Sequence, residues 1–306
     1  MSGKVEGLAW LEGGLMSRKT AVAILLIAAS VMLVAQNNYE KQILLERQGT
    51  QKEMQDDMGP LYVIGRYHVR EGRITLGSAS GSTVVLPKNA PALLGTIERR
   101  AETVTFEAAG SVPVFVDGKK IEGVTTLRTK NEVDKLLSGD FSFSVQSGQS
   151  GMILLVRDRQ SPYAKSFHGL LWFPVNSTYK LEATFTPYAD AKSARVPDTQ
   201  GGTREMRVPG FLAFALEGKT LRLDVFANSP DYLFLMFKDG TSGKETYGGG
   251  RYLQIDPPKN GKAVVDFNRA YNPICAVSPF FSCPIVPSQS ILPVRVEAGE
   301  KYRASH

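Results

Sequence analysis

An apolar run of fifteen residues without a charge, residues 21–35, stands near the start of the chain behind the cations Arg18 and Lys19. Such a run is typical of a segment that directs a chain to a membrane. As a helix it would rise about 23 Å, less than a hydrocarbon core of roughly 30 Å. A cleaved signal peptide and an uncleaved signal anchor therefore both remain open for residues 1–35. Because flanking cations stay on the cytoplasmic side, we expect everything after residue 36 to be extracytoplasmic, either anchored by a single pass or secreted after cleavage.

The remainder of the chain is expected to be almost entirely β. Residues 36–57 mix many charges with a thin apolar stripe, which predicts a polar helical stalk. From residue 61 short β-type runs alternate with turns at a spacing of roughly 8–12 residues, which favours a sandwich. The runs cover residues 72–76, 83–86, 103–106, 114–116, 179–185, 211–216, 221–226 and 232–237. Residues 217–219 and 228–231 are expected to form hairpin turns between the later runs.

Length and a polar interruption suggest how these runs divide into domains. A chain of 306 residues corresponds to about two domains of roughly 150 residues each. The polar stretch 158–162 separates two apolar groups, so we predict β domains at residues 58–157 and 158–306. The expected fold is thus mainly β: a membrane-targeting helix, then an antiparallel sandwich, then an antiparallel sandwich or barrel.

The charge distribution gives no indication of nucleic-acid binding. The formal net charge is +6, and residues 36–306 carry 33 basic and 28 acidic residues, or +5, because residues 1–35 hold three Lys or Arg and two Glu. The basic residues are scattered, with only pairs such as Arg99-Arg100, so no stripe exists that would neutralise a run of phosphates. The expected partners are a membrane, through the N-terminal helix, and a small polar or anionic ligand.

Two cysteines, Cys275 and Cys283, lie close together near the C-terminus. In an oxidising compartment the simplest expectation is a disulfide that closes a small loop and stabilises it by about 2–3 kcal/mol. A metal site would need further ligands, and the three His do not stand in a metal-binding spacing, so neither a metal nor another cofactor is expected. A nucleophilic cysteine remains an alternative.

The stretch 76–145 resembles a forkhead-associated sandwich. The resemblance rests on LGSASGSTVVLP from Leu76, on LLGTIE, on VFVDGKKI and on LLSGDFSFSV. Members of that family bind phosphothreonine through an Arg after Gly, a Ser near a His and an Asn before Gly. Here Ser78 follows Gly77 and Asp117 precedes Gly118, and an acidic residue there repels phosphate. The resemblance therefore implies the fold and argues against phosphopeptide binding.

The last quarter carries the main resemblance. FKDGTSGKETYGGGRYL (residues 237–253) is followed by DFNRAYNPICAVSPFFSCPIVPSQSILPVRVEAGEK (residues 266–301), and we name these two segments together the C-terminal signature. They resemble domain-of-unknown-function family sixteen-eighty-four, and the likeness extends through FHGLLWFP to cover roughly residues 61–301. Ile274 stands where the family commonly has a second Pro. The family implies relatives and no activity.

The polar residues of the signature are the candidate binding site. Three glycines before Arg251 let the backbone approach another strand or a ligand. Arg251 and Arg269 either pair with Glu245 and Asp266 in a half-buried network or bind an anionic group in a pocket. In the second arrangement hydrogen bonds and stacking walls come from the remaining candidates, which are Tyr247, Asn268, Tyr271 and Asn272, with Tyr252 as a further wall.

The prolines of the signature exclude a regular element at its end. Five of them fall within residues 273–293, too many for a central strand or a helix interior, so an ordered loop is expected. This loop either serves function or covers the open end of the β domain.

Two function classes remain. The first is an exported or envelope-associated binding module with a polar pocket in its C-terminal domain. The second is a hydrolase of envelope or extracellular material, with Asp266 or Glu245 as acid or base and Arg251 or Arg269 as clamp. An enzyme requires these groups around one open cleft, whereas a structural network closes them in pairs. The sequence leaves the ligand and the oligomeric state open.

Overall fold

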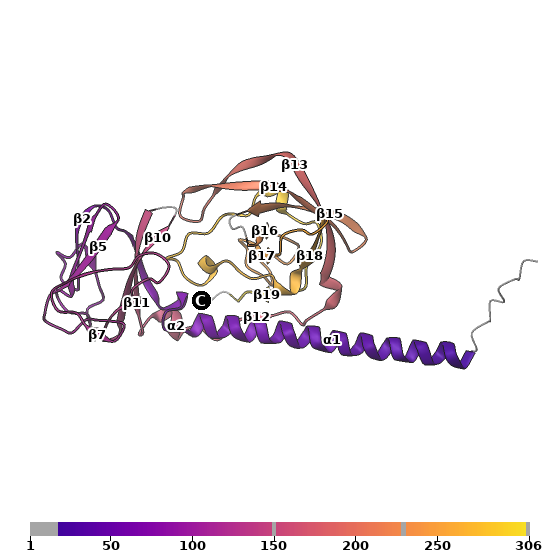
Figure 1. Cartoon of the computed structure of the whole chain (residues 1–306), viewed down its shortest axis with the longest axis horizontal. Helices are drawn as coiled ribbons and strands as arrows, with labels where there is room; N and C mark the ends of the chain where they lie inside the picture. Colours follow the sequence, from indigo (N-terminus) through magenta and orange to yellow (C-terminus); the bar gives the residue numbers. More distant parts are fainter. Residues whose placement is uncertain (1–17, 149–150, 228–230, 304–306) are drawn as a thin grey trace, which may run out of the picture. The chain divides into compact units, whose positions relative to one another are not determined.

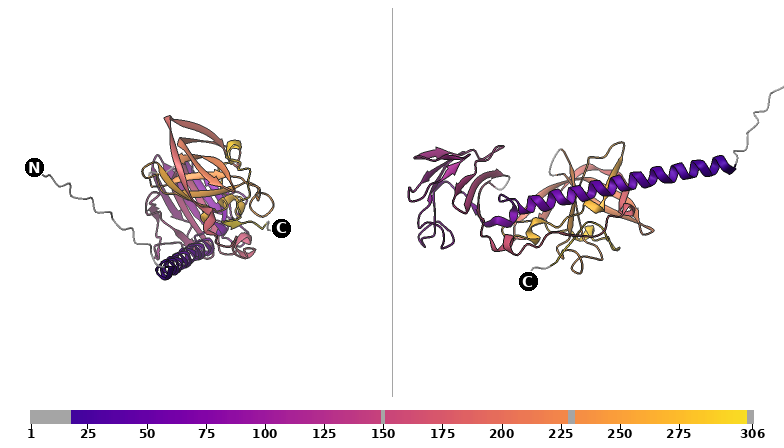
Figure 2. Two further views of the ribbon diagram at one scale, coloured as in Figure 1. Left: turned by 90° about the vertical axis from the view of Figure 1, so that its right-hand side faces the viewer. Right: turned by 90° about the horizontal axis from the view of Figure 1, so that it is seen from below.

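The computed structural model describes residues 18–148, 151–227 and 231–303, with side chains described from Val34 onward. It divides into two compact units, residues 1–46 and residues 47–306, which are described separately. A single helix, α1 (Arg18–Gln55), runs through the first unit and into the second, as Figures 1 and 2 show. The polar segment predicted to be helical is therefore part of a longer helix, and its role as a stalk stays a prediction.

The predicted leader falls largely outside this description. Residues 1–17 are not described, and for residues 18–33 only the helical backbone is. Within the described part of the chain, no helix is both long enough and apolar enough to cross a membrane. The expectation of a membrane-targeting segment at residues 1–35 remains untested.

The second unit is mainly β, as predicted. Eleven strands precede residue 159: β1 (Val63–His68), β2 (Gly72–Gly77), β3 (Val84–Val85), β4 (Gly95–Arg100), β5 (Thr103–Ala108), β6 (Phe115–Val116), β7 (Lys119–Lys120), β8 (Val124–Thr126), β9 (Leu136–Ser138), β10 (Phe141–Gly148) and β11 (Gly151–Asp158). They form a six-stranded sheet in the order β1-β11-β10-β9-β6-β7 and a five-stranded sheet in the order β3-β2-β4-β5-β8. All neighbours are antiparallel except the short parallel pair β2 and β3.

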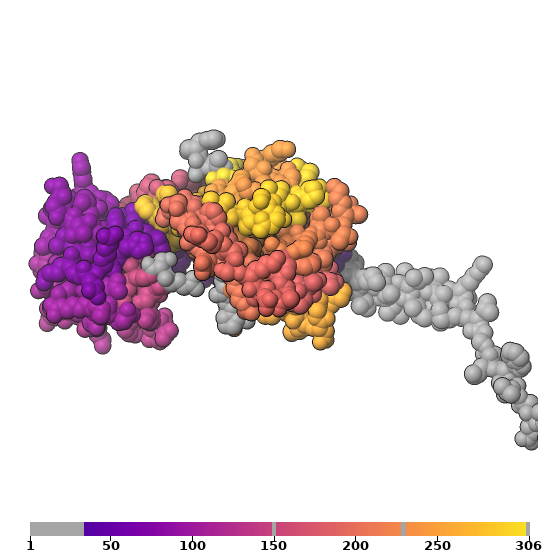
Figure 3. Space-filling view, turned by 90° about the horizontal axis from the view of Figure 1, so that it is seen from above, coloured from indigo at the N-terminus to yellow at the C-terminus, as the bar shows by residue number. Residues whose placement is uncertain are grey.

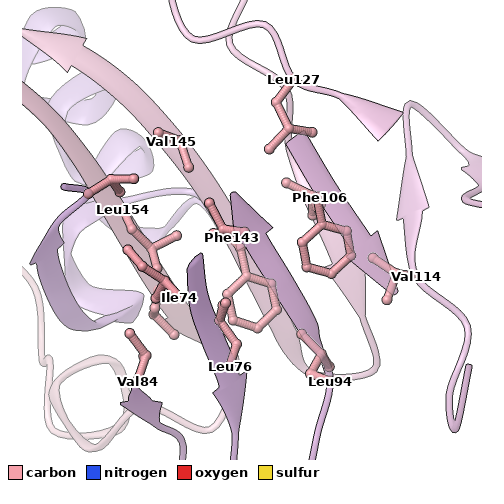
Figure 4. Close-up of a cluster of buried hydrophobic side chains, with 14 of the residues drawn as sticks. Ile74, Leu76, Val84, Leu94, Phe106, Val114, Leu127, Phe143, Val145 and Leu154 are labelled. Atoms are coloured by element: carbon pink, nitrogen blue, oxygen red, sulfur yellow. The ribbon is translucent and has the colours of Figure 1, made fainter. Parts of the chain in front are cut away.

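The two sheets enclose one apolar core. Figure 4 shows side chains of both sheets pointing toward one another, among them Leu76 and Phe106 from one sheet and Phe143 and Leu154 from the other. These four side chains are essentially inaccessible to solvent. Each buried side chain of this size contributes about 1.5–3 kcal/mol, so the alternating pattern of apolar residues drives the pairing of the sheets.

Eight further strands follow β11, and short helical turns lie between several of them. The elements are η1 (Pro60–Tyr62) before β1, α2 (Pro162–Lys165), β12 (Leu171–Trp172), η2 (Ser177–Tyr179), β13 (Lys180–Pro197), β14 (Thr203–Leu216), β15 (Lys219–Ala227), β16 (Leu233–Phe237), β17 (Arg251–Ile255), β18 (Lys262–Asp266), η3 (Phe267–Arg269), η4 (Ile274–Ala276), η5 (Ser288–Ser290) and β19 (Glu300–Lys301). β17-β16-β15-β14-β13-β18 is a six-stranded antiparallel sheet, and β12 pairs with β19. Figure 3 shows the surface of residues up to 158 in indigo to magenta and that of residues from 171 in red to yellow.

The hairpin from β14 to β15 turns within the predicted residues 217–219, but Lys219 already pairs with Leu216, so the turn consists of Glu217 and Gly218, both with positive φ. The other predicted turn, at residues 228–231, lies mostly outside the described residues.

Strand β16 is buried on both faces. Leu233, Leu235 and Phe237 belong to one apolar cluster, whereas Phe234 and Met236 belong to another. The proline-rich segment and the residues that follow it supply the cover on the two sides. Cys283 and Val286 pack into the cluster of Phe234, and residues 292–298 contribute four apolar side chains to the cluster of Phe237. The loop predicted at residues 273–293 is thus ordered, and one of its functions is to complete the core.

Candidate functional site

Arg251, the first residue of β17, is the centre of a closed polar network. Its side chain has no exposed surface. Nη2 donates to Asp239 Oδ2 at 2.6 Å and to the carbonyl of Val296 at 2.8 Å, while Nη1 donates to the carbonyl of Ala298. Burial lowers the pKa of the guanidinium, and the carboxylate of Asp239 opposes this. The arginine therefore fastens the segment before β19 to the β16–β17 connection.

Gly250 makes this arrangement possible. Its φ is +95°, and a Cβ there would lie 2.6 Å from Val286 Cγ2 and 2.7 Å from the carbonyl oxygen of Phe237. Of the two alternatives for the glycine run before Arg251, the structure therefore shows close approach to protein, because strand β16 and the proline-rich segment fill the space that a side chain would need.

Glu300, at the start of β19, lies behind the same network and is only 5% exposed. Its Oε2 accepts a hydrogen bond from the backbone N–H of Asn272 at 2.8 Å, and Asn272 Nδ2 donates to the carbonyl of Lys301 at 3.0 Å. Burial raises the pKa of Glu300 to about 7, although the bonds from Asn272 and the charge of Arg251 act in the opposite direction. A carboxyl group with a near-neutral pKa changes its charge under ordinary conditions.

The backbone before Glu300 is equally constrained. Gly299 has φ +80°, and a Cβ would come within 2.6 Å of the carbonyl oxygens of Phe267 and Ala270. A Gly-Glu pair is therefore required to carry the carboxylate into this position.

Two tyrosines hold the end of the described chain against the proline-rich segment. The rings of Tyr247 and Tyr302 meet edge to face with centroids 5.0 Å apart. The N–H of Tyr302 donates to the carbonyl of Glu245 at 2.8 Å, and its hydroxyl donates to the carbonyl of Ala276 at 3.2 Å. Residues that the sequence marked as candidates thus surround residues 300–302.

A pocket of about 290 Å³ opens beside these residues. Its walls mix apolar side chains with basic and hydroxyl groups. The lining residues are Leu61, Tyr163, Ser166, Phe167, His168, Gly169, Leu170, Leu171, Ala276, Val277, Glu300, Lys301, Tyr302 and Arg303. We refer to it as the Glu300 pocket. The volume suits a small ligand, and cations at Lys301 and Arg303 favour an acidic one.

Cys275 directly precedes Ala276 of this pocket. Both are free thiols in the structure, and the N–H of Cys275 points to Cys283 Sγ at 3.4 Å. Hydrogen bonds from Cys283, Thr199 and Tyr247 outweigh burial and lower the pKa of Cys275 to about 7, while the pKa of Cys283 is raised by its bond to Cys275 and by burial. The thiols are close enough to interact, and the disulfide stays a prediction.

The remaining candidates gather around η3. Asp266 caps this turn, since its Oδ1 accepts from the N–H and from Nδ2 of Asn268, both at 3.1 Å. Arg269 Nη1 lies 3.6 Å from Asp266 Oδ2. Both residues line a second cleft of about 550 Å³ that also includes Tyr232 and Gln254. This is the pairing that the sequence suggested for Arg269.

The other two predicted partners pair differently. Glu245 contacts Arg295 at the surface, whereas Arg251 contacts Asp239. Asn268 is fully buried and exchanges hydrogen bonds with the backbone of Asn176, and Tyr271 packs its ring against Tyr252 with centroids 6.1 Å apart.

Comparison with known proteins gives a family for this region. The model of the family described as "Protein of unknown function (DUF1684)" matches residues 165–301. An uncharacterized protein of Haloarcula marismortui, known from a solution NMR structure, is 34% identical over 46% of this chain and 80% of that chain, with a TM-score of 0.40. The chain belongs to the DUF1684 family.

Other solved structures match a smaller share of the chain. The forkhead-associated domain of the CT664 protein from Chlamydia trachomatis is 20% identical over 31% of this chain and 92% of that chain, with a TM-score of 0.23. No curated protein matches the chain.

Every candidate named from the sequence, and Glu300 as well, lies within the DUF1684 match. Sequence reasoning missed Glu300 and Asp239 as site residues. For Glu300 a signal was present, because a glycine directly before an acidic residue at the end of the signature is compatible with a tight approach to other backbone. The burial of the carboxylate depends on residues 267–272, which are distant in sequence.

Proposed function

We propose that this DUF1684 member is a non-catalytic binding module, and that the Glu300 pocket takes a small ligand with an apolar body and an acidic group. The observation that carries the proposal is the buried carboxyl of Glu300, with its raised pKa, in the wall of a 290 Å³ pocket that Lys301 and Arg303 also line. A protonated Glu300 donates a hydrogen bond to a ligand oxygen, and the nearby cations attract the ligand's charge.

The geometry favours binding over the hydrolase considered from the sequence. That hydrolase needs Asp266 or Glu245 in one cleft with Arg251 or Arg269. Arg251 has no exposed surface, and Glu245 pairs with Arg295. Asp266 and Arg269 do line one cleft, but the Asp266 side chain is only 3% exposed, caps η3 and lies 3.6 Å from Arg269. The residues that line the Glu300 pocket include neither Asp266 nor Glu245.

A thermal-shift panel with the purified full-length chain tests the proposal. We expect aliphatic carboxylates, aromatic carboxylates or sugar acids to raise the unfolding temperature at pH 6, because a ligand at 100 times its Kd stabilises the folded state by about 2.7 kcal/mol. The shift should shrink at pH 8, where the ionised Glu300 repels an anion.

The double variant Lys301→Gln with His168→Ala removes polar groups from the wall of the Glu300 pocket and should abolish the shift. Lys262→Gln, which changes an exposed lysine of the other cleft, is the matched control and should leave it unchanged. A panel without any effective compound, or a shift that persists in the double variant, contradicts binding in the Glu300 pocket.

We also propose that the module works outside the cytoplasm, held at the membrane or released from it. The support is the apolar run at residues 21–35 behind Arg18 and Lys19, together with a cysteine pair whose thiols lie side by side. Intact mass spectrometry of the protein isolated from its native cells is the measurement. We expect a mass about 2 Da below that of the dithiol form, as one disulfide requires.

The same spectrum shows whether the leader is present or cleaved. Recovery of the full-length dithiol protein from the cytosolic fraction contradicts both the export and the disulfide.

A further inference from the structure

Arg157 in β11 is a buried cation to which the described residues supply no counter-charge. The residue is only 7% exposed. Nε donates to the carbonyl of Met58 at 3.0 Å and Nη1 donates to Ser144 Oγ at 3.2 Å. Among the residues that the structure describes, none places a carboxylate within ion-pair distance of this guanidinium. Buried charges in proteins are normally paired, so the position calls for an explanation.

Arg251 shows what the usual arrangement is in this chain. Its side chain has no exposed surface, and Asp239 neutralises it at 2.6 Å. For Arg157, burial lowers the pKa, and the only opposing contribution comes from the charge of Asp56, which lies too far away to form an ion pair. Neutral acceptors satisfy part of the guanidinium and leave its charge uncompensated.

The uncompensated side of Arg157 faces a hollow. Nη2 has no hydrogen-bond acceptor among the described residues. It is not fully buried, so solvent or a ligand reaches it. Arg157 lines a pocket of about 180 Å³ between the β9–β10 turn and the end of β11. A hydrogen-bond donor on a buried cation is therefore open to a ligand.

The other charges around this pocket favour an anion. Lys135 and Arg159 line it together with the carboxylates of Asp57 and Asp140. Asp57 is neutralised by Arg159, whose Nη2 lies 2.9 Å from its Oδ2. Asp140 accepts a hydrogen bond from Gln160 at 3.4 Å. The balance of three cations against two carboxylates leaves one positive charge.

We propose that this pocket is an oxyanion site, in which Arg157 and Lys135 bind a phosphate, sulfate or carboxylate group. Its lining residues are distinct from the Gly77-Ser78 and Asp117-Gly118 turns, and it shares none with the Glu300 pocket. A bound oxyanion supplies the missing counter-charge and accepts from Nη2, and charge-assisted bonds of this kind are the stronger ones. The site is independent of the ligand proposed for the Glu300 pocket.

Isothermal titration calorimetry of the full-length chain is the test, with inorganic phosphate, sulfate and acetate as probes and chloride at equal ionic strength as the reference. We expect saturable binding of at least one probe to the wild type. Lys135→Glu should weaken it about tenfold or more, because it reverses an exposed charge of the pocket without removing a described hydrogen bond. Preference for the tetrahedral probes or for acetate identifies the ligand class.

Lys119→Glu is the matched control, since Lys119 is an exposed lysine on β7 outside the pocket. It should leave the affinity unchanged. Arg157→Lys keeps the positive charge but loses the planar guanidinium with its several donors, so it should also weaken binding. Circular dichroism confirms that this variant is folded. Absence of saturable binding to the wild type overturns the proposal, and so does an equal loss of affinity in Lys135→Glu and Lys119→Glu.

Discussion

Replacing Arg251 by methionine is expected to lower the free energy of unfolding by about 3–5 kcal/mol, because the change leaves the buried carboxylate of Asp239 without its partner. Two backbone carbonyls, at Val296 and Ala298, lose their donor at the same time. Both lie in the segment that leads to β19, so the loss also loosens the wall that carries Glu300. Urea unfolding followed by circular dichroism measures the effect.

Two further variants test whether the loss of stability comes from the broken Arg251–Asp239 ion pair. Arg251→Met combined with Asp239→Leu should recover a large part of the loss, since no buried charge is then left unpaired. Arg295→Gln breaks the pair with Glu245, in which both side chains are more than one third exposed, and should leave the free energy of unfolding nearly unchanged. If Arg251→Met is as mild as Arg295→Gln, the central role given to Arg251 is wrong.

Sequence reasoning predicted best the strands in which apolar and polar residues alternate, because this alternation matches which side chains are buried. Residues 221–226 lie within β15 (Lys219–Ala227), where alternate residues face the core. The turn at residues 217–218 follows from its glycine and from the runs on either side. Such features depend on neighbours in sequence, which is why a single sequence contains them.

β13 shows where this reasoning stops. Residues 179–185 were expected to form a strand, but β13 extends from Lys180 to Pro197 and pairs with β14 over its outer part. Most residues beyond Pro187 in this arm are exposed, so no apolar period marks them as a strand. Partners supplied by β14 hold the arm in place, and pairing of this kind is not visible in the local sequence.

Sequence reasoning named polar residues of the C-terminal signature as candidates, but it did not identify which of them pair with one another. Arg251 and Asn272 are indeed part of a polar network, because a signature rich in Arg, Asn and Tyr has few apolar alternatives for burial. The partner of Arg251 is Asp239 rather than Glu245, although all three lie within residues 237–253. The tight turn of Asp239 onto the N–H and hydroxyl of Thr241 orients its carboxylate inward, and residue types alone do not specify that direction.

Glu300 makes the stability of the folded chain depend on pH in a direction that is unusual for an acidic residue. The folded-state pKa of about 7 lies above the ordinary value of 4.5, so the folded state binds the proton more tightly. Stability from this group is therefore fully present below pH 4.5 and is lost as the pH rises to about 7. The interval is worth about 3 kcal/mol, since one pH unit corresponds to about 1.4 kcal/mol.

Glu300→Gln should remove this dependence, because a neutral amide needs no proton. At pH 8 the variant is expected to be more stable than the wild type by up to about 3 kcal/mol, and at pH 4.5 the difference should nearly vanish. Glu297→Gln, which alters an exposed carboxylate paired with Arg295, should follow the wild type at every pH. Parallel curves for the wild type and Glu300→Gln between pH 4.5 and 8 show that the carboxylate is already ionised throughout. The pH-dependent ligand affinity proposed for the Glu300 pocket then loses its physical basis as well.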